Sequence, residues 1–303
     1  MRYLVFDISN LLHRTFFAQR DLDEETVAGM AGHVALVTLN KYFKMYKPHS
    51  VIMAFDRSSW RKVYTASDEC VSKKPYKGNR RQNMTPSQEA KFQQFLGHLA
   101  EFEALVRDNT TIATLAQDTL EADDLIAGFT QIYADEDNEI IIISADSDLL
   151  QLTKHPNVVV VSPATDKPQT LDDYDGDPLY YLFQKCVRGD STDNVQSAFP
   201  RVRSTRIRKA YDDEFERVQM MMETWTDHND VTFVVGDLFK ENQKLIDLEK
   251  QPPNIRKLIY ETVDAEMDRS RQFSMFHILK FLGKYKLNKI KEGMDQYIPL
   301  LSR

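Results

Sequence analysis

Short apolar runs alternate with helical patterns over the first half of the chain. Tyr3–Phe6, Ser50–Phe55 and Glu139–Ser144 are almost continuously hydrophobic, which is typical of parallel strands that helices cover on both faces. Val158–Val161 is a fourth candidate strand. Because strands and helices alternate, the pattern predicts an α/β fold with a central, mostly parallel sheet flanked by helices.

Three segments between these runs carry apolar residues at helical spacing. They are Thr26–Tyr46, the stretch that begins at Thr85, and Leu120–Tyr133. The second opens with Thr85-Pro86-Ser87-Gln88, a capping box with proline at the first helical position. We therefore expect a helix to begin at Thr85.

Beyond about Asp177 the strand signal fades and helical patterns dominate. The predicted helices are Pro178–Val187, Ser204–Ala210, Asp213–Glu223, Pro253–Asp268 and Gln272–Leu282. The chain is thus predicted to divide into an α/β domain over residues 1–176 and a mostly helical region over residues 177–303.

Composition fits a globular protein with a sizeable core, since 42% of the 303 residues are hydrophobic. Two cysteines offer neither a disulfide framework nor metal-ligand spacing. No run approaches the roughly 18 apolar residues that span a bilayer, and the first residues read as a strand rather than a signal peptide. We expect a soluble, cytoplasmic protein without membrane contact.

Charge is unevenly distributed along the chain. The net charge of −7 argues mildly against nucleic-acid binding, but three stretches are basic. Residues 201–209 hold five bases and residues 277–291 hold five lysines, both without an acid. The third stretch, residues 57–81, holds Arg57, Arg61, Lys62, Lys73, Lys74, Lys77, Arg80 and Arg81.

Acids follow the three strongest strands at Asp7, Asp56 and Asp146. A single acid after a strand is usually a loop residue or a helix cap, but the carboxyl ends of parallel strands meet at one sheet edge. Asp148 beside Asp146 and two further segments add acids, so that the predicted constellation is Asp7, Asp56, Glu121, Asp123, Asp124, Asp146, Asp148, Asp190 and Asp193.

Nine carboxylates at one edge would repel one another strongly without cations. Oxygen ligands without His or Cys favour Mg²⁺, with Mn²⁺ as a substitute, and no EF-hand spacing supports calcium storage. Nine are too many for one Mg²⁺ and suit two ions about 3.5–4 Å apart, the arrangement used in phosphodiester hydrolysis. We predict that all nine are catalytic metal ligands.

Five of these segments resemble, in order and spacing, the motifs of the flap endonuclease/5′-nuclease family. They are Phe6-Asp7, Ala54-Phe55-Asp56, Glu121-Ala122-Asp123-Asp124, Asp146-Ser147-Asp148 and Gly189-Asp190-Ser191-Thr192-Asp193-Asn194. The chain looks most similar to the stand-alone phage ribonuclease H and 5′-3′ exonuclease proteins, also through residues 239–248. The resemblance implies a PIN-like fold and a first metal held by Asp7, Asp56, Glu121, Asp123, Asp124 and Asp146. It places a second metal near Asp148, Asp190 and Asp193.

Residues 57–84 resemble the arch through which the single-stranded 5′ end passes in this family. By that resemblance Lys77 approaches the scissile phosphate, and Arg80 or Arg81 neutralises developing charge. A cationic stretch with Trp60, Tyr64 and Tyr76 also combines phosphate attraction with stacking faces. The predicted DNA contacts of this stretch are Trp60, Arg61, Tyr64, Lys73, Lys74, Lys77, Arg80 and Arg81.

The segment after Asn194 lacks the glycines with which the family grips duplex phosphates in a helix–turn–helix element. Residues 196–206 contain no glycine, and side chains with a Cβ resist the positive φ of such turns. We therefore expect no potassium site here and hypothesise that side-chain cations replace the amide contacts. They are Arg201, Arg203, Arg206, Arg208 and Lys209.

The predicted function is a structure-specific 5′ to 3′ nuclease acting on duplex or flapped DNA and on RNA·DNA hybrids. Its expected role is RNA-primer removal in DNA replication, as a monomer that meets single-stranded DNA-binding protein or a sliding clamp, in the host cytoplasm if the origin is phage. Two alternatives remain open, a PIN-type endoribonuclease and a non-catalytic DNA-structure-binding replication protein.

Overall fold

A six-stranded sheet forms the centre of the computed structural model, which describes residues 1–18, 24–80 and 84–303. The strand order is β3-β2-β1-β4-β5-β6. Only β6 is antiparallel to its neighbour among these strands. The bounds are β1 Arg2–Asp7, β2 Ser50–Ala54, β3 Ala113–Leu115, β4 Glu139–Ile143, β5 Val158–Ser162 and β6 Lys167–Pro168. The four predicted strands and the mostly parallel sheet are confirmed.

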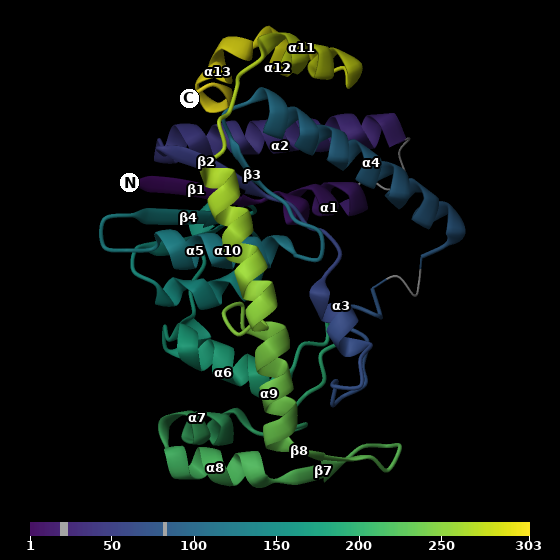
Figure 1. Cartoon of the computed structure of the whole chain (residues 1–303), viewed down its shortest axis with the longest axis vertical. Coiled ribbons are helices and arrows are strands. Elements are labelled where there is room, and N and C mark those ends of the chain that lie inside the picture. Colours follow the sequence, from purple (N-terminus) through teal and green to yellow (C-terminus); the bar gives the residue numbers. More distant parts are fainter. Residues whose placement is uncertain (19–23, 81–83) are drawn as a thin grey trace.

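Helices cover both faces of this sheet, which explains why its strands are apolar throughout (Figure 1). Leu4 and Phe6 of β1 face one layer, made by α1 (Ile8–Ala18), α2 (Glu24–Tyr46) and α4 (Pro86–Asn109). Tyr3 and Val5 face the other, made by α5 (Ala122–Tyr133), the 3-10 helix η1 (Ser147–Lys154) and α10 (Pro253–Met267).

The strand order reverses at β1, which lies between β2 and β4. Ligands of open parallel sheets bind outside the carboxyl ends of the strands at such a switch point. Asp7 ends β1, Asp56 follows β2, and Asp146 follows β4. The topology therefore brings together the three acids that the sequence placed at one edge.

The predicted capping box of α4 is present. The Thr85 side chain accepts a hydrogen bond from the Gln88 backbone N–H at 3.3 Å, and the Thr85 N–H donates to Gln88 Oε1 at 2.9 Å. Within the described ranges no helix combines the length and the apolar character that crossing a bilayer requires.

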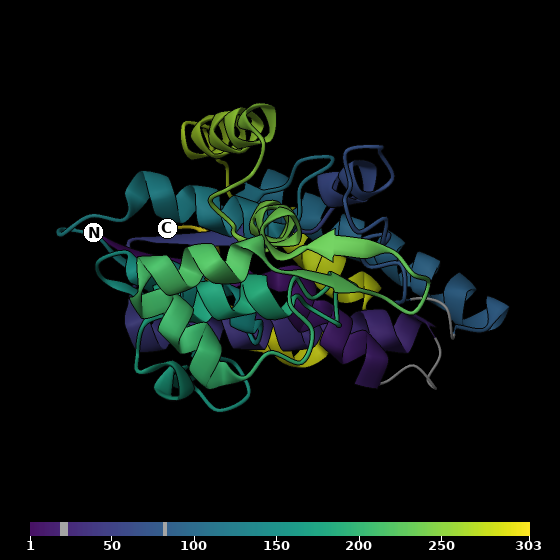
Figure 2. The same ribbon diagram turned by 90° about the horizontal axis from the view of Figure 1, so that it is seen from below.

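A smaller layer of helices lies below the sheet in Figure 1 and in front of it in Figure 2. It contains α6 (Pro178–Arg188), α7 (Ser204–Asp212), α8 (Glu214–Met222), α9 (Val235–Ile246) and the hairpin β7 (Thr224–Thr226)–β8 (Thr232–Val234). These elements share a small core around Val187, Ile207 and Met220. The short helix α3 (Trp60–Thr65) lies between this layer and the sheet edge.

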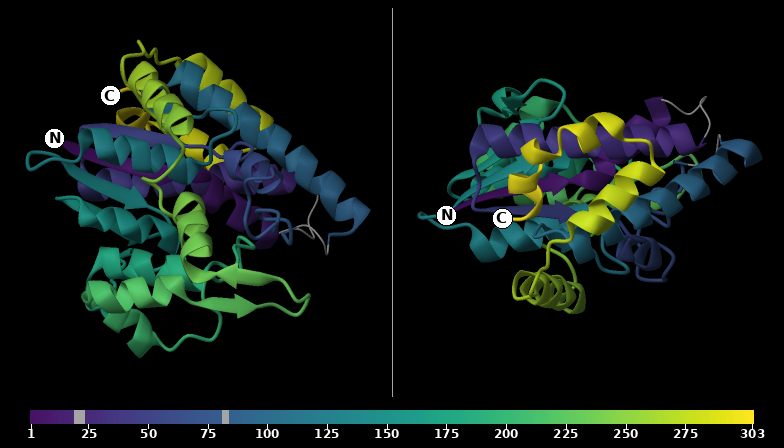
Figure 3. Two further views of the ribbon diagram at one scale, coloured as in Figure 1. Left: turned by 60° about the horizontal axis from the view of Figure 1, so that its bottom comes forward. Right: turned by 90° about the horizontal axis from the view of Figure 1, so that it is seen from above.

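The last helices return to the α/β core. Ile259 and Val263 of α10 pack into the core on the α5 side of the sheet. The helices α11 (Met275–Lys284), α12 (Asn288–Glu292) and α13 (Ile298–Leu301) lie over α2 and α4 (Figure 3) and contribute Ile278, Leu282 and Leu300 to the other core. Residues 177–303 thus form the lower layer and also contribute to both faces of the α/β core, whereas the sequence pattern grouped them as one helical region.

Candidate metal centre and nucleic-acid interface

Four acids lie at the carboxyl edge of the sheet without an ion pair to any residue that the structure describes. Asp7, Asp56, Asp123 and Asp146 make no ion pair within residues 1–18, 24–80 and 84–303. We call these four residues the uncompensated acids. They come from the ends of β1, β2 and β4 and from the first turn of α5.

Neutral donors fix several of these side chains. Asp7 accepts hydrogen bonds from the Asn10 N–H at 3.0 Å and from Ser144 Oγ at 2.8 Å. Asp56 accepts from the Ala122 N–H at 2.8 Å, which ties the end of β2 to the start of α5. Asp146 caps η1 by accepting from the Asp148 N–H at 2.9 Å.

Burial and repulsion between carboxylates raise the pKa values of Asp7, Asp56 and Asp123. Burial, followed by the charge of Asp56, raises the pKa of Asp7 to about 7. Burial and the charge of Glu121 raise the pKa of Asp56. Burial and the charges of Asp146, Asp7 and Asp56 hold the pKa of Asp123 well above its usual range. The uncompensated acids therefore favour binding a cation.

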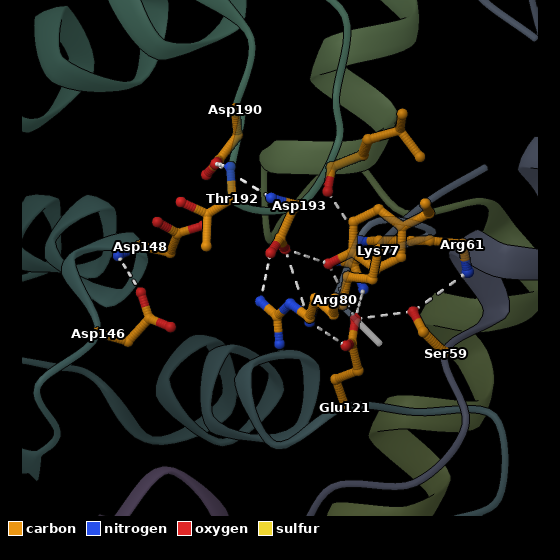
Figure 4. A network of polar contacts seen from close by, with 12 residues as sticks. Ser59, Arg61, Lys77, Arg80, Glu121, Asp146, Asp148, Asp190, Thr192 and Asp193 are labelled. Carbon is orange, nitrogen blue, oxygen red and sulfur yellow. Dashed lines mark hydrogen bonds and ion pairs between the residues drawn. The ribbon is translucent and has the colours of Figure 1, made fainter. Parts of the chain in front are cut away.

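Glu121 lies in a network of donors from the basic segment (Figure 4). Its Oε1 pairs with Lys77, and its Oε2 accepts from Ser59 Oγ at 2.7 Å and lies 3.2 Å from the Tyr76 hydroxyl. Burial alone would raise the pKa of Glu121, but the charges of Lys77 and Arg61 outweigh it and bring the pKa to about 2. Glu121 is thus ionised and already paired.

Asp193 joins the same network from the turn after α6. Tyr76 donates to its Oδ2 at 2.7 Å, Arg80 pairs with its Oδ1, and the Lys77 ammonium lies 3.6 Å from Oδ2. Asp148 and Asp190 share a different cation, Lys185 of α6, whose ammonium pairs with Asp148 and lies 3.0 Å from Asp190 Oδ2. Gly189 has a φ of 70°, and a Cβ there would lie 2.6 Å from the Gln196 carbonyl, so the turn that presents Asp190 requires glycine.

Asp124 has another partner. It is fully buried, and its two oxygens accept from the Arg61 guanidinium at 2.9 and 2.8 Å. Arg61 is only 2% exposed, and Trp60 beside it is 5% exposed. The prediction that Trp60 and Arg61 contact DNA is corrected, because both side chains are packed inside and Arg61 is committed to Asp124. The Arg61 guanidinium thus engages both oxygens of Asp124.

The described acidic side chains are not arranged around a common point at which they would coordinate a metal ion. In the described part of the chain no group of three or more acidic, histidine or cysteine side chains is arranged to hold a metal ion. The donor chemistry nevertheless fits a hard divalent cation, because the uncompensated acids offer carboxylate oxygens alone and none of them makes an ion pair with a described residue.

The basic segment is anchored to the turn that carries Asp193. The Lys77 N–H donates to the Asp193 carbonyl at 2.8 Å, and the Asn194 side chain donates to the Pro75 carbonyl at 2.9 Å. Lys77 and Asn194 both take positive φ, 54° and 60°, at this junction. Lys73 and Lys74 are exposed, Tyr64 is half-buried, and Arg81 lies outside the described residues.

The predicted duplex-binding cations fall into two kinds. Arg206 pairs with Glu223, Arg208 with Asp175 and Asp212, and Lys209 with Glu216. Arg201 and Arg203 are exposed and make no ion pair within the described ranges. Arg201 takes a φ of 60°, so the chain adopts a left-handed turn here although the residue has a Cβ.

Lys185 and Tyr76 are site residues whose roles sequence reasoning missed. Lys185 stands five residues before Asp190 in a helix that was predicted, and the excess of acids around it was the available signal. Tyr76 was expected to stack on bases, yet it is buried and its hydroxyl donates to Asp193 beside Glu121.

The sheet topology and the helices on both of its faces define a fold of the PIN-like class. Residues 2–176 match the family model described as 5′-3′ exonuclease, N-terminal resolvase-like domain, and the chain belongs to that family. Ribonuclease H of Enterobacteria phage T4 is 28% identical over 194 residues, which cover 59% of each protein. The 5′-3′ exonuclease of Mycoplasmopsis pulmonis is 26% identical over 202 residues, 64% of this chain and 61% of the relative. The chain thus spans about three fifths of the length of each of these relatives.

Solved structures support the same fold. A bacteriophage T5 protein co-crystallised with metal ions superimposes with a TM-score of 0.65 at 17% identity, over 88% of this chain and all of that one. The bacteriophage T5 flap endonuclease in a complex with DNA and metal ions gives a TM-score of 0.60 at 18% identity, over 87% of this chain. At these identities the likeness establishes the fold.

Proposed function

We propose that this protein is a nuclease that cleaves phosphodiesters from 5′ to 3′ with two divalent ions, Mg²⁺ with Mn²⁺ as a substitute. One observation carries the proposal. Asp7 is buried and Asp56, Asp123 and Asp146 are partly buried at the switch point of a parallel sheet, and none of these uncompensated acids makes an ion pair in the described ranges. Such a group is stabilised by a divalent cation.

The first ion would be held by the uncompensated acids with help from Glu121, and the second by Asp148, Asp190 and Asp193. The ions would supply Lewis-acid polarisation of the phosphate and neutralise its developing charge. Lys77 and Arg80 belong to the same network as Asp193, so their positive charges are available to a phosphate at this edge. The Tyr76 hydroxyl donates its single proton to Asp193 Oδ2 at 2.7 Å and lies 3.2 Å from Glu121 Oε2, so it orients both carboxylates.

The proposed substrates are duplex or flapped DNA and RNA·DNA hybrids with a free 5′ end. The names of the T4 and T5 relatives support this choice, as does a basic segment anchored beside the acids. We further propose that the protein removes RNA primers during replication as a monomer in the cytoplasm. Single-stranded DNA-binding protein and a sliding clamp are the proposed partners.

A Mg²⁺ titration with three 5′-labelled substrates tests the proposal. A DNA flap, an RNA·DNA hybrid and single-stranded RNA are incubated with the full chain, and products are sized from the labelled end. Mg²⁺-dependent release of short 5′ products from the flap and the hybrid is expected. Cleavage of single-stranded RNA alone would indicate a PIN-type endoribonuclease, and binding without cleavage would indicate a DNA-structure-binding protein.

A further inference from the structure

Lys185 brings a positive charge between two acids from separate segments. Its ammonium pairs with Asp148, at the start of η1, and lies 3.0 Å from Oδ2 of Asp190, in the turn after α6. The three side chains are 14%, 22% and 15% exposed, so the pairs are mostly shielded from water. Shielding strengthens the attraction relative to an exposed ion pair.

The helix that carries Lys185 is fixed relative to Asp148. Tyr181, one turn earlier on α6, donates a hydrogen bond to the carbonyl of Ser147 at 2.9 Å. Asp177 caps the same helix by accepting from the Leu179 and Tyr180 backbone N–H groups. The ammonium is therefore held near Asp148 and Asp190 by its own helix rather than by a flexible loop.

The two acidic groups thus differ in their counter-charge. The uncompensated acids have no basic partner in the described ranges, whereas Asp148 and Asp190 share Lys185. A divalent ion at the second group must either displace this ammonium or bind within a few ångströms of it, and both cost free energy.

We propose that the Lys185 ammonium neutralises Asp148 and Asp190, and that a second divalent ion must displace this ammonium in order to bind there. The proposal rests on the proposed two-ion function and adds a regulation to it. The first ion binds independently of Lys185. The second ion binds more weakly because it competes with the ammonium for Asp148 and Asp190.

Calorimetric titration of the full chain with Mn²⁺, without DNA, tests this. The variants are Lys185→Met, which keeps the length of the side chain without its charge, and Lys185→Arg, which keeps the charge. Arg188→Met is the matched control, because Arg188 lies in the last turn of the same helix and donates to Ser204 Oγ. Lys185→Met should bind the second Mn²⁺ about tenfold tighter or more, as removal of a nearby like charge predicts. The affinity for the first Mn²⁺ should be the same in every variant. Lys185→Arg and Arg188→Met should also bind the second Mn²⁺ with wild-type affinity.

Each other outcome decides the question. If the wild type binds one ion and Lys185→Met binds two, the ammonium blocks the second site completely and the proposal holds. An unchanged or lost second site in Lys185→Met overturns it. Should Lys185→Met fail to fold by circular dichroism, Lys185→Gln is titrated with the same expectations. Asp148→Asn separates the two hypotheses, because loss of the weaker site in that variant keeps the two-ion function even when the Lys185 proposal fails.

Discussion

The acids at the sheet edge differ in what neutralises them. Glu121 and Asp193 pair with Lys77 and Arg80, and Asp124 pairs with Arg61. Asp7, Asp56 and Asp123 make no ion pair in the described ranges, and their pKa values are raised by burial and by neighbouring acids. Only some of the nine predicted ligands therefore need a divalent ion to neutralise them. Single-residue variants can show which acids these are.

Asp146→Asn is the variant that best isolates charge. The amide oxygen can still accept from the Asp148 N–H, so the cap of η1 is kept while one metal-binding charge is lost. We expect Mg²⁺-dependent cleavage to fall by at least about a hundredfold, the scale for losing one charge-stabilising group, with DNA binding largely intact. Single-turnover cleavage of a labelled flap and fluorescence anisotropy measure the two effects.

The exposed acid Asp172 offers the control for this comparison, since Asp172→Asn should leave both quantities unchanged. Undiminished cleavage by Asp146→Asn would contradict the two-ion account. Asp148→Asn is expected to behave like Asp146→Asn.

At the residue scale, the sequence predicted where the acids lie better than it predicted which basic residues pair with them. Strand ends place Asp7, Asp56 and Asp146 at one edge, because the rule depends only on local hydrophobic runs. Arg61 and Lys185 reach their acids across 63 and 37 residues of sequence. No local pattern specifies such pairs, so burial of Arg61 and compensation of Asp148 required the structure.

At the element scale, Arg61 ties three helices together. From α3 it pairs with Asp124 of α5 and donates to the Leu245 carbonyl of α9 at 2.8 Å. Arg61→Met should therefore lower the free energy of unfolding by about 3–5 kcal/mol, because it leaves Asp124 buried and unpaired. Urea unfolding of the metal-free protein measures the change.

The variant Asp124→Asn tests whether Asp124 stabilises the fold or binds a metal ion. If the role of Asp124 is structural, the variant should be less stable than the wild type. The folded variant should then still bind Mg²⁺ with wild-type affinity in calorimetric titration. The double variant Arg61→Met/Asp124→Asn should be more stable than the sum of the single losses predicts, since no unpaired charge remains. Wild-type stability with weakened Mg²⁺ binding would instead make Asp124 a ligand.

Long periodic elements were predictable from local pattern, and α9 was not. The capping box and apolar stripe of α4 depend on neighbours in sequence. In α9, by contrast, Glu241 and Asn242 are buried polar residues. Glu241 accepts from the Ser72 N–H at 3.0 Å, and Asn242 donates to the Cys186 and Gln196 carbonyls at 2.8 Å each. These partners lie 46 to 169 residues away in sequence, so no local pattern specifies that Glu241 and Asn242 are buried.

At the scale of the whole molecule, the chain leaves the α/β core and returns to it. The helices α10–α13 pack on the two faces of that core, although they follow the lower helical layer in sequence. Composition changes once, near residue 176, and therefore cannot indicate the return. Since the acids lie where the layers meet, the stability of the whole fold should respond to their ionisation.

The metal-free protein should lose stability as pH rises from about 4 to about 7. Asp7 and Asp148 have folded pKa values of about 7 and about 6, above their ordinary 3.8. Each binds a proton in the folded state that the unfolded chain has released, so its stabilising effect is lost as pH rises through the folded pKa. Glu121, at about 2, has the opposite sign, but its contribution changes only below its ordinary 4.5.

Thermal unfolding in EDTA tests this sign. The melting temperature should fall across the window, by roughly 2–4 °C for each kcal/mol lost, and saturating Mg²⁺ should remove the fall by neutralising the acids. Asp7→Asn should flatten the metal-free profile, which separates the acids from histidines that titrate in the same window. A melting temperature that rises with pH without metal would contradict the assignment.

The affinity for duplex DNA should depend on the exposed cations that make no ion pair with a described residue, Arg201 and Arg203. Arg203→Gln removes an exposed, unpaired charge, whereas Arg206→Gln removes one that Glu223 partly neutralises. Neutralising a phosphate contact weakens binding of all sequences alike and lowers the slope of log affinity against log salt by about 1. Arg203→Gln and Arg201→Gln should show this decrease, and Arg206→Gln should show less of it. An unchanged slope for Arg203→Gln, together with binding that requires K⁺ specifically, would mean that backbone amides hold the phosphates despite the missing glycines.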